Sequence, residues 1–168
     1  MQNVYLIGMM GSGKTSTGRA LASLGSMHFL DLDEEIESQT HLTINEIFQK
    51  KGEPFFRTEE KRILSEAVRG TDTVVATGGG VVLDPENVER MNATGRVIYL
   101  AASFETLWQR VRNKKDRPLL SASDPKAVFF RLFQERGPLY ETACRGKVDT
   151  DGLSPEAVAK QIFKQYLR

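Results

Sequence analysis

A glycine-rich segment near the N-terminus has the spacing of a phosphate-binding loop. Residues 8–15 read GMMGSGKT and fit G-x-x-x-x-G-K-[ST] in full. Glycines at these positions let backbone N–H groups face phosphate oxygens, and the N-terminus of a following helix adds a positive dipole end. A lysine here binds the β- and γ-phosphates, and the hydroxyl after it can bind Mg²⁺. The segment predicts a nucleoside triphosphate site formed by Gly11, Ser12, Gly13, Lys14, Thr15 and Ser16.

Two aspartates stand where a second apolar stretch ends. Asp31 and Asp33 lie at the carboxyl end of the segment 29–32, which we interpret as a strand. Ligands of open α/β sheets bind at this edge, and alternate residues of a strand share a face, so both carboxylates could point into one crevice. One could hold Mg²⁺ through water, and the other could accept a hydrogen bond from a substrate hydroxyl. A simpler interpretation, compatible with the first, is that they cap the next helix.

Two arginines stand out by their sequence surroundings. Arg57 lies in EPFFRTEE, and Glu60 follows three residues later, a helical spacing at which the carboxylate can hold the guanidinium. Arg136 lies in ERGPLY, where the Gly-Pro pair at 137–138 predicts a break in the helix 125–143. Most arginines are solvated surface residues, so neither is informative alone.

A third arginine lies in a polar stretch that we interpret as a mobile lid. Residues 112–124 are basic at first and then polar, and Arg117 stands there in the sequence DRPLL. A lid of this kind could close over the phosphates and bring a cation to the group being transferred.

Three consecutive glycines, Gly78, Gly79 and Gly80, follow the apolar strand expected at 73–76. The simplest interpretation is a turn that requires positive φ, which one glycine would satisfy. Three in a row indicate instead that bare backbone meets a ligand closely. A side chain there would fill the space between the phosphate-binding loop and the two aspartates.

Two short motifs offer an alternative function as a nucleotide-dependent switch. Residues 113–116 read NKKD, which matches the guanine-binding N-K-x-D of GTPases, and residues 149–152 read DTDG, which matches their D-x-x-G. The context disagrees, because a charged helical segment precedes the first motif and the two motifs occur in the reverse order. A preference for GTP over ATP would revive this alternative.

Strands and helices alternate along the chain and would position these segments. The expected strands cover 4–7, 29–32, 73–76, 96–100 and 147–149. The expected helices cover 14–24, 43–52, 54–69, 85–91, 104–112, 125–143 and 155 to the C-terminus. This order predicts an α/β fold with a five-stranded parallel sheet and helices on both faces. The 168 residues favour one domain, 1–168.

Composition narrows the class of protein. Hydrophobic residues make up 40% and the net charge is +1, so nothing draws the chain as a whole to nucleic acid or membranes. The single cysteine, Cys144, excludes an internal disulfide and suits the cytoplasm. We identify no secretory leader and no apolar run long enough for a membrane span.

The ordered set of motifs resembles the shikimate kinase family. G-x-x-G-x-G-K-T, D-L-D, F-R-x-x-E, T-G-G-G, R-P-L-L and E-R-x-P-L-Y occur in this order between residues 4 and 144. The resemblance implies an ATP-dependent kinase with the three-layer P-loop fold of nucleoside monophosphate kinases. Such a kinase phosphorylates the 3-hydroxyl of shikimate in aromatic amino-acid biosynthesis, and we expect a cytoplasmic monomer with Mg²⁺ as cofactor.

The same resemblance implies roles for individual residues. Asp33 would hold the shikimate hydroxyls as the candidate base, and Asp31 would support Mg²⁺ beside Thr15. The substrate-binding region would cover about residues 32–60. Arg57 and Arg136 would bind the carboxylate of shikimate, and Gly78, Gly79 and Gly80 would face the acceptor. Lys14 and Arg117 would act on the ATP phosphates. Arg110 and the turn near Pro155 would flank the adenine.

Other kinases of small metabolites remain open as alternatives. Gluconate kinase and nucleoside monophosphate kinases share the phosphate-binding loop and the lid, and a sugar acid would also need a carboxylate clamp. The motifs F-R-x-x-E and T-G-G-G favour shikimate over these acceptors, through their resemblance to the shikimate kinase family.

Overall fold

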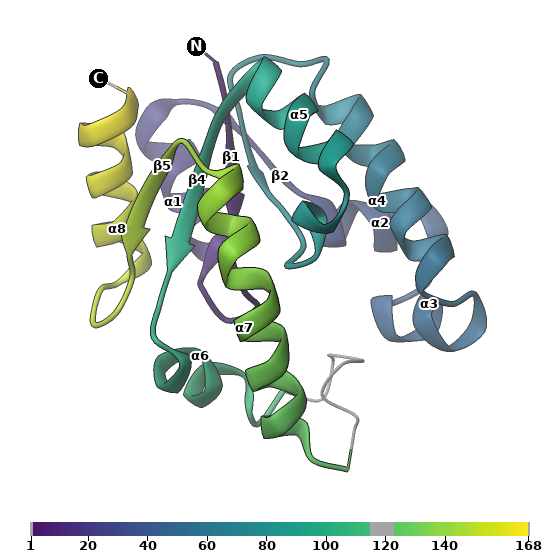
Figure 1. The fold of residues 1–168 in the computed structure, drawn as a ribbon. Coiled ribbons are helices and arrows are strands. Elements are labelled where there is room, and N and C mark those ends of the chain that lie inside the picture. Colours follow the sequence, from purple (N-terminus) through teal and green to yellow (C-terminus); the bar gives the residue numbers. More distant parts are fainter. Residues whose placement is uncertain (1, 115–122, 168) are drawn as a thin grey trace.

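A computed structural model describes residues 2–114 and 123–167, and its centre is a parallel sheet (Figure 1). The strands are β1 (Asn3–Ile7), β2 (His28–Asp31), β3 (Thr73–Ala76), β4 (Gly95–Ala101) and β5 (Gly146–Asp149). Their order is β2-β3-β1-β4-β5, and every pair is parallel. The predicted five-stranded parallel sheet is confirmed.

The helices alternate with the strands as the sequence predicts, but the helix directly after β2 is one that the sequence did not predict. They are α1 (Lys14–Gly25), α2 (Leu32–Thr40), α3 (Ile44–Lys50), α4 (Glu53–Ala67), α5 (Pro85–Thr94), α6 (Phe104–Val111), α7 (Pro125–Ala143) and α8 (Pro155–Ile162). Two shorter helical segments are also described, the 3-10 helix η1 (Val81–Leu83) and the π-helix η3 (Phe163–Leu167). Local sequence sets several starts. The Thr43 hydroxyl and Glu46 form a capping box at α3, and Ser103 and Ser154 cap α6 and α8.

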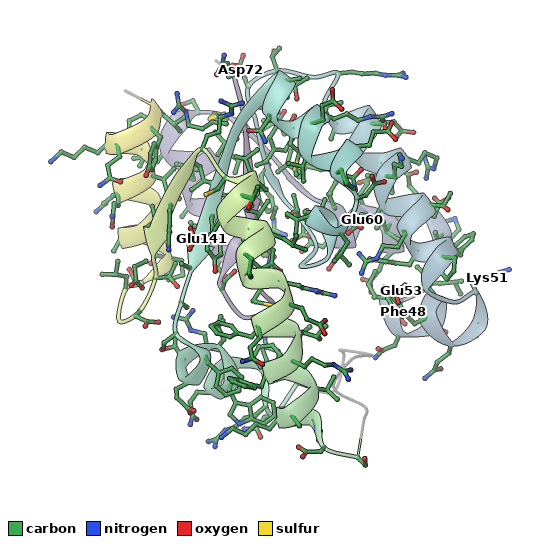
Figure 2. The ribbon with its side chains drawn as sticks, in the orientation of Figure 1. Phe48, Lys51, Glu53, Glu60, Asp72 and Glu141 are labelled. Carbon is green, nitrogen blue, oxygen red and sulfur yellow. The ribbon has the colours of Figure 1, made fainter. Side chains whose placement is uncertain are left out.

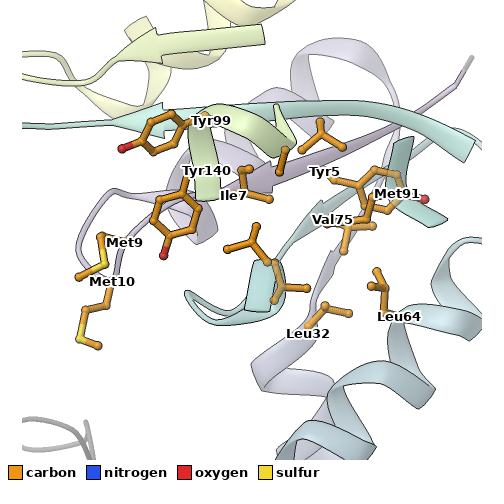
Figure 3. Packing of buried hydrophobic residues seen from close by; sticks show 14 of the residues in the cluster. Tyr5, Ile7, Met9, Met10, Leu32, Leu64, Val75, Met91, Tyr99 and Tyr140 are labelled. Carbon is orange, nitrogen blue, oxygen red and sulfur yellow. The ribbon is translucent and has the colours of Figure 1, made fainter. Parts of the chain in front are cut away.

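Alternation along β1 divides the core into two layers. Val4 and Leu6 pack against α1 and α8, together with apolar residues of those helices. Tyr5 and Ile7 face the opposite layer, which includes residues of α4, α5 and α7 (Figure 3). Successive side chains of a strand point to opposite faces, so a strand buried on both sides is mostly apolar, and the polar Asn3 at the start of β1 donates a hydrogen bond to Gly70 O. All five residues of β1 are buried, and helices cover both faces of the sheet.

The predicted break in the helix 125–143 is wrong. The Gly-Pro pair at 137–138 does not break a helix, because α7 runs without interruption from Pro125 to Ala143 with Pro138 inside it. A proline ring costs one hydrogen bond to the preceding turn, and tertiary packing can outweigh that cost. Phe129 and Tyr140 of α7 are both fully buried against the core. Arg136 therefore lies on a continuous helix.

The sheet gathers the predicted site segments at one edge. Because β1, β2 and β3 are adjacent and parallel, the segments that follow them leave the sheet at the same side. Those segments hold the phosphate-binding loop, the two aspartates and the three glycines. Among the described residues, no helix is long and apolar enough to cross a membrane.

Candidate active site

The phosphate-binding loop has a backbone that only glycine adopts readily. Gly8, Gly11 and Gly13 have φ values of 147°, 84° and 87°. Gly13 precedes α1, and no side chain caps that helix start. The first N–H groups of a helix need an acceptor, so this end of α1 suits an anion.

Lys14 and Ser12 place polar groups around the same loop. Lys14 Nζ donates to the carbonyl oxygens of Gly8 at 2.8 Å and Met9 at 3.0 Å. Ser12 Oγ is buried, and no hydrogen-bond partner for it exists among the described residues. A buried orphan hydroxyl beside a helix N-terminus fits a phosphate oxygen as its missing partner.

Thr15 and Asp31 form the oxygen pair expected to support a metal. Thr15 Oγ1 donates to Asp31 Oδ2 at 2.6 Å. The other oxygen, Asp31 Oδ1, accepts from the N–H groups of Asp33 at 3.0 Å and Glu34 at 3.3 Å, and so caps α2. Asp31 thus caps α2, as expected, while its other oxygen bonds to the Thr15 hydroxyl. Within residues 2–114 and 123–167 no group of three metal-ligating side chains occurs. Mg²⁺ needs only a few protein oxygens when phosphates and water supply the rest.

Asp33 reaches the crevice, but not by alternating with Asp31 along a strand as the sequence predicts. Strand β2 ends at Asp31, and Asp33 belongs to the first turn of α2 instead of alternating with Asp31 on a strand. Both side chains still line one cavity of about 520 Å³. The cap at Asp31 turns the chain into the helix and brings Asp33 round to the crevice.

That large cavity has the volume of a cofactor site. Its walls come from the phosphate-binding loop, Asp31, Asp33, the glycine turn and the segment between β5 and α8. Arg110, expected beside the adenine, lines it and donates to the carbonyl oxygens of Gly11 at 3.0 Å and Thr150 at 3.4 Å. Pro155 also lines it, as does Lys114, whose contribution the sequence did not indicate.

A second, smaller cavity of about 60 Å³ adjoins the first. The two cavities share Met10, Asp33, Gly78 and Gly79. The rest of the small cavity is lined by Ile44, Phe48, Phe56, Arg57, Glu60, Gly80 and Arg136. Asp33, Gly78 and Gly79 thus line both cavities, whereas Arg57, Gly80 and Arg136 line only the smaller one. Asp33 therefore lies between the two arginines and the phosphate-binding loop.

Two carboxylates of α4 hold Arg57 in place, and Figure 2 labels both. Arg57 Nη1 donates to Glu60 Oε1 at 2.8 Å, and Nε and Nη2 donate to Glu53 Oε1 at 3.3 and 3.2 Å. Burial opposes the charge of Arg57, but Glu60 and Glu53 together outweigh it and raise the pKa. The predicted pairing of Arg57 with Glu60 is confirmed.

Glu60 is itself buried, with 1% of its surface exposed. Burial raises its pKa, Arg57 opposes that rise, and the nearby negative charge of Asp33 adds to it. Its second oxygen, Oε2, is buried and has no hydrogen-bond partner in the described part of the chain. The sequence indicated the ion pair but gave no sign that Asp33 faces the same carboxylate.

Arg136 and Tyr140 lie one turn apart on α7 and both are buried. The Tyr140 hydroxyl donates to the carbonyl oxygen of Gly79. No carboxylate of the described residues forms an ion pair with Arg136 within 4.0 Å. A buried guanidinium at the edge of a cavity suits an anionic ligand. Sequence reasoning identified Arg136 and missed Tyr140.

Lack of space for a side chain explains Gly78 and Gly80, and Gly79 lies in ordinary contact with its neighbours. None has positive φ, so the interpretation as a left-handed turn is wrong. A Cβ on Gly78 would lie 2.8 Å from Glu60 Oε2 and 3.2 Å from Asp33 Oδ1. A Cβ on Gly80 would lie 2.4 Å from Arg57 Nη2, and one on Gly79 would lie 3.4 Å from Arg136 Nη1. Charged side chains of three helices occupy the volume that the glycines leave.

The glycine turn directs its carbonyl groups toward the protein. Gly78 O accepts from Val81 N at 3.2 Å, Gly80 O accepts from Leu83 N at 3.0 Å, and Gly79 O accepts from Tyr140. The N–H groups of the three glycines have no hydrogen-bond acceptor among the described residues. The turn therefore has backbone donors to offer to oxygen atoms of a ligand.

Arg117 and the centre of the lid, 115–122, lie outside the described residues. The DTDG segment has a structural role, because Asp151 accepts from Ser103 N at 3.1 Å and Asp149 accepts from Asp151 N at 2.9 Å. These contacts tie the β5–α8 loop to the start of α6.

Comparison with known proteins gives one consistent family. The family model described as Shikimate kinase matches residues 10–167. The shikimate kinase of Thermodesulfovibrio yellowstonii is 43% identical, over 100% of this chain and 96% of the relative. That of Nitrosospira multiformis is 42% identical, over 97% and 84%. The structure titled shikimate kinase from Acinetobacter baumannii in complex with shikimate superimposes with a TM-score of 0.96 at 39% identity, covering 99% of this chain and 93% of that one.

Proposed function

Because the chain belongs to the shikimate kinase family, we propose that it transfers the γ-phosphoryl group of ATP to the 3-hydroxyl of shikimate. The products are shikimate 3-phosphate and ADP, and the reaction is a step of aromatic amino-acid biosynthesis. One observation of the structure carries the proposal. A cavity of nucleotide size meets a smaller cavity with two arginines, and Asp33 lines both.

The nucleotide would occupy the large cavity. The N–H groups of the phosphate-binding loop and the start of α1 would bind the phosphates, and Lys14 would lie on the β- and γ-phosphates. Arg110 and the turn at Pro155 would border the base, since both line this cavity. Thr15 and Asp31 would hold Mg²⁺, which when bound neutralises phosphate charge.

The acceptor would occupy the smaller cavity. Arg57 and Arg136 would bind the carboxylate of shikimate, because guanidinium groups match the geometry of a carboxylate. Backbone N–H groups of the glycine turn would donate hydrogen bonds to oxygen atoms of shikimate. Asp33 would bind the 3-hydroxyl at the junction, which is the side of the cavity that faces the nucleotide.

The chemistry then needs one proton transfer and one displacement. The acceptor oxygen forms a bond to the γ-phosphorus, the bond between that phosphorus and the β,γ-bridging oxygen breaks, and the hydroxyl proton passes to Asp33. Positioning and charge neutralisation supply most of the catalysis in phosphoryl transfer. Arg117, from the expected lid, would add a cation at the transferring group. We also propose that the protein works as a monomer in the cytoplasm.

A comparison of acceptors tests the proposed function. ADP release is measured with MgATP and, in turn, shikimate, quinate, gluconate, AMP and CMP. We expect release with shikimate to exceed release with every other acceptor. Activity with a nucleotide acceptor alone would contradict the proposal, and activity with gluconate alone would indicate a sugar-acid kinase.

Asp33→Asn tests the role of the carboxylate at the junction. We expect turnover to fall about 10²- to 10⁴-fold, the range of general acid–base contributions. Glu34→Gln is the matched control, since it removes a charge in the same helical turn from an exposed residue that pairs with Arg19. Near-normal turnover of Asp33→Asn would show that Asp33 is not essential.

A further inference from the structure

The hydroxyl of Tyr140 connects α7 to the glycine turn. Tyr140 is fully buried, and its hydroxyl donates to the carbonyl oxygen of Gly79. A Cβ on Gly79 would lie 3.6 Å from Tyr140 Oη, 3.4 Å from Arg136 Nη1 and 3.6 Å from Met10 N. Gly79 therefore lies where the phosphate-binding loop, α7 and the glycine turn meet, and Tyr140 makes the hydrogen bond that joins the last two.

This hydrogen bond orients a peptide group. The carbonyl of Gly79 and the N–H of Gly80 belong to one planar peptide unit, and the described chain contains no cis peptide bond. In a trans unit these two groups point in opposite directions. The hydroxyl that holds the carbonyl thus directs the N–H of Gly80 away from Tyr140. The smaller cavity includes Gly80 in its lining but not Tyr140.

The same hydroxyl fixes the position of Arg136. Residues four apart on a helix lie on one face, so Tyr140 and Arg136 approach the glycine turn together. Because the hydrogen bond anchors α7 to Gly79, it also sets the distance between the Arg136 guanidinium and the backbone donors of the turn.

We propose that Tyr140 is a positioning residue for the acceptor site. Its hydroxyl holds the Gly79–Gly80 peptide unit and Arg136 in the arrangement that binds the acceptor carboxylate and hydroxyls. The inference rests on the proposed function, because acceptor binding is the property that the hydroxyl controls. It concerns the acceptor side, since Gly80 and Arg136, the two groups that the hydroxyl positions, line the smaller cavity and not the nucleotide cavity.

Tyr140→Phe removes the hydroxyl and keeps the ring. The ring stacks on Tyr99 with centroids 5.2 Å apart and an interplanar angle of 28°, a contact that phenylalanine preserves (Figure 3). We expect the KM and the dissociation constant for shikimate to rise about tenfold, which corresponds to about 1.4 kcal/mol. The KM for ATP should stay within about twofold. KM values come from ADP release, and the dissociation constant comes from calorimetric titration with shikimate.

Tyr99→Phe is the matched control. It makes the same chemical change in the other ring of the stacked pair, and within the described residues no hydrogen bond of its hydroxyl is recorded. Both variants are assayed at a temperature at which circular dichroism shows them folded. We expect Tyr99→Phe to leave both KM values within about twofold of the wild type.

The outcomes separate this inference from the proposed function. A wild type that neither binds nor phosphorylates shikimate would refute both. An active wild type with a Tyr140→Phe variant of equal shikimate affinity, or with equal rises in both KM values, would refute only the role of Tyr140. A lower melting temperature with unchanged shikimate affinity would show that the hydroxyl serves stability alone, and would also refute it.

Discussion

Two glycine turns lie side by side at the edge of the sheet, and they need glycine for different reasons. In the phosphate-binding loop, Gly8, Gly11 and Gly13 all have positive φ, so the backbone conformation itself requires them. In the second turn, none of Gly78, Gly79 and Gly80 has positive φ, and Gly78 and Gly80 are required because charged side chains occupy the neighbouring space.

The difference separates a local feature from a tertiary one. The first turn places its own lysine, and Lys14 Nζ bonds to carbonyl groups of the same loop. The second turn is surrounded by side chains of α2, α4 and α7, which come from distant parts of the sequence. A substitution in the first turn should act through conformation and nucleotide binding, and one in the second through the position of a neighbour.

Removal of Lys14 should give the largest effect, on the nucleotide side. We expect Lys14→Ala to lower kcat by about 10³-fold, since the charge stabilises the transferring phosphoryl group. Steady-state ADP release with shikimate measures it. Lys114→Ala is the control, because Lys114 lines the same cavity outside the loop, and it should change kcat by less than about tenfold. Equal losses would show that overall charge, and not the loop geometry, is what matters.

Gly80→Ala and Gly13→Ala test the contrast between space and conformation. The Cβ of Gly80→Ala would lie 2.4 Å from Arg57 Nη2, at the end of a flexible side chain, so the guanidinium should shift with little loss of stability. Loss of a charge-assisted contact should raise the KM for shikimate about tenfold to a hundredfold. Gly79→Ala should have a smaller effect in the same direction, since its nearest contact is 3.4 Å.

Gly13→Ala should behave in the opposite way. Its Cβ would meet nothing closer than 3.7 Å, but φ is +87°. We expect the strain to lower stability by about 1–2 kcal/mol and to raise the KM for ATP more than that for shikimate. Melting temperatures and the KM values for ATP and shikimate are measured for Gly13→Ala, Gly79→Ala and Gly80→Ala. They show whether each glycine is needed for its conformation or for the space beside it. If Gly80→Ala affected ATP more, the second turn would belong to the nucleotide site.

The smallest effect should come from the buried charge beside the second turn. The pKa of Glu60 lies above its ordinary value of 4.5, chiefly through burial. Folding therefore favours its protonated form, and this contribution to stability is complete below pH 4.5 and is lost as the pH rises through the raised pKa. The free energy of unfolding of the wild type should fall relative to that of E60Q over this interval, by about 1.4 kcal/mol for each pH unit that separates the ordinary pKa from the raised one.

Urea unfolding of both proteins at several pH values measures this difference. The control is E46Q, because Glu46 is exposed and its pKa is lowered by the backbone hydrogen bond of the capping box. Its contribution is present above the ordinary pKa and is lost as the pH falls, so the wild type should gain stability over E46Q as the pH rises. The same trend for both variants would exclude a cost of burial at Glu60.

The contrast between the turns also explains which expectations held. The phosphate-binding loop, the strand order along the chain and the pairing of Arg57 with Glu60 depend on contacts within a few residues, and sequence spacing reveals them. Tyr140 contacts a carbonyl 61 positions earlier, and nothing in the sequence around either residue indicates it. Asp33 was expected to share a strand face with Asp31. The strand ends at Asp31, which caps α2, so Asp33 reaches the crevice from the first turn of that helix.

The sequence by itself determined the phosphate-binding loop, the alternation of strands and helices and the family of the chain. Glycine conformation, capping and hydrophobic alternation act over short distances, so residue types and spacing are enough to specify them. Only the tertiary structure decided that Asp33, Glu60, Arg57 and Arg136 surround three glycines with ordinary φ values, and that Tyr140 holds the middle one. That arrangement depends on how α2, α4 and α7 pack at the end of β3, and packing brings together residues that the sequence keeps far apart.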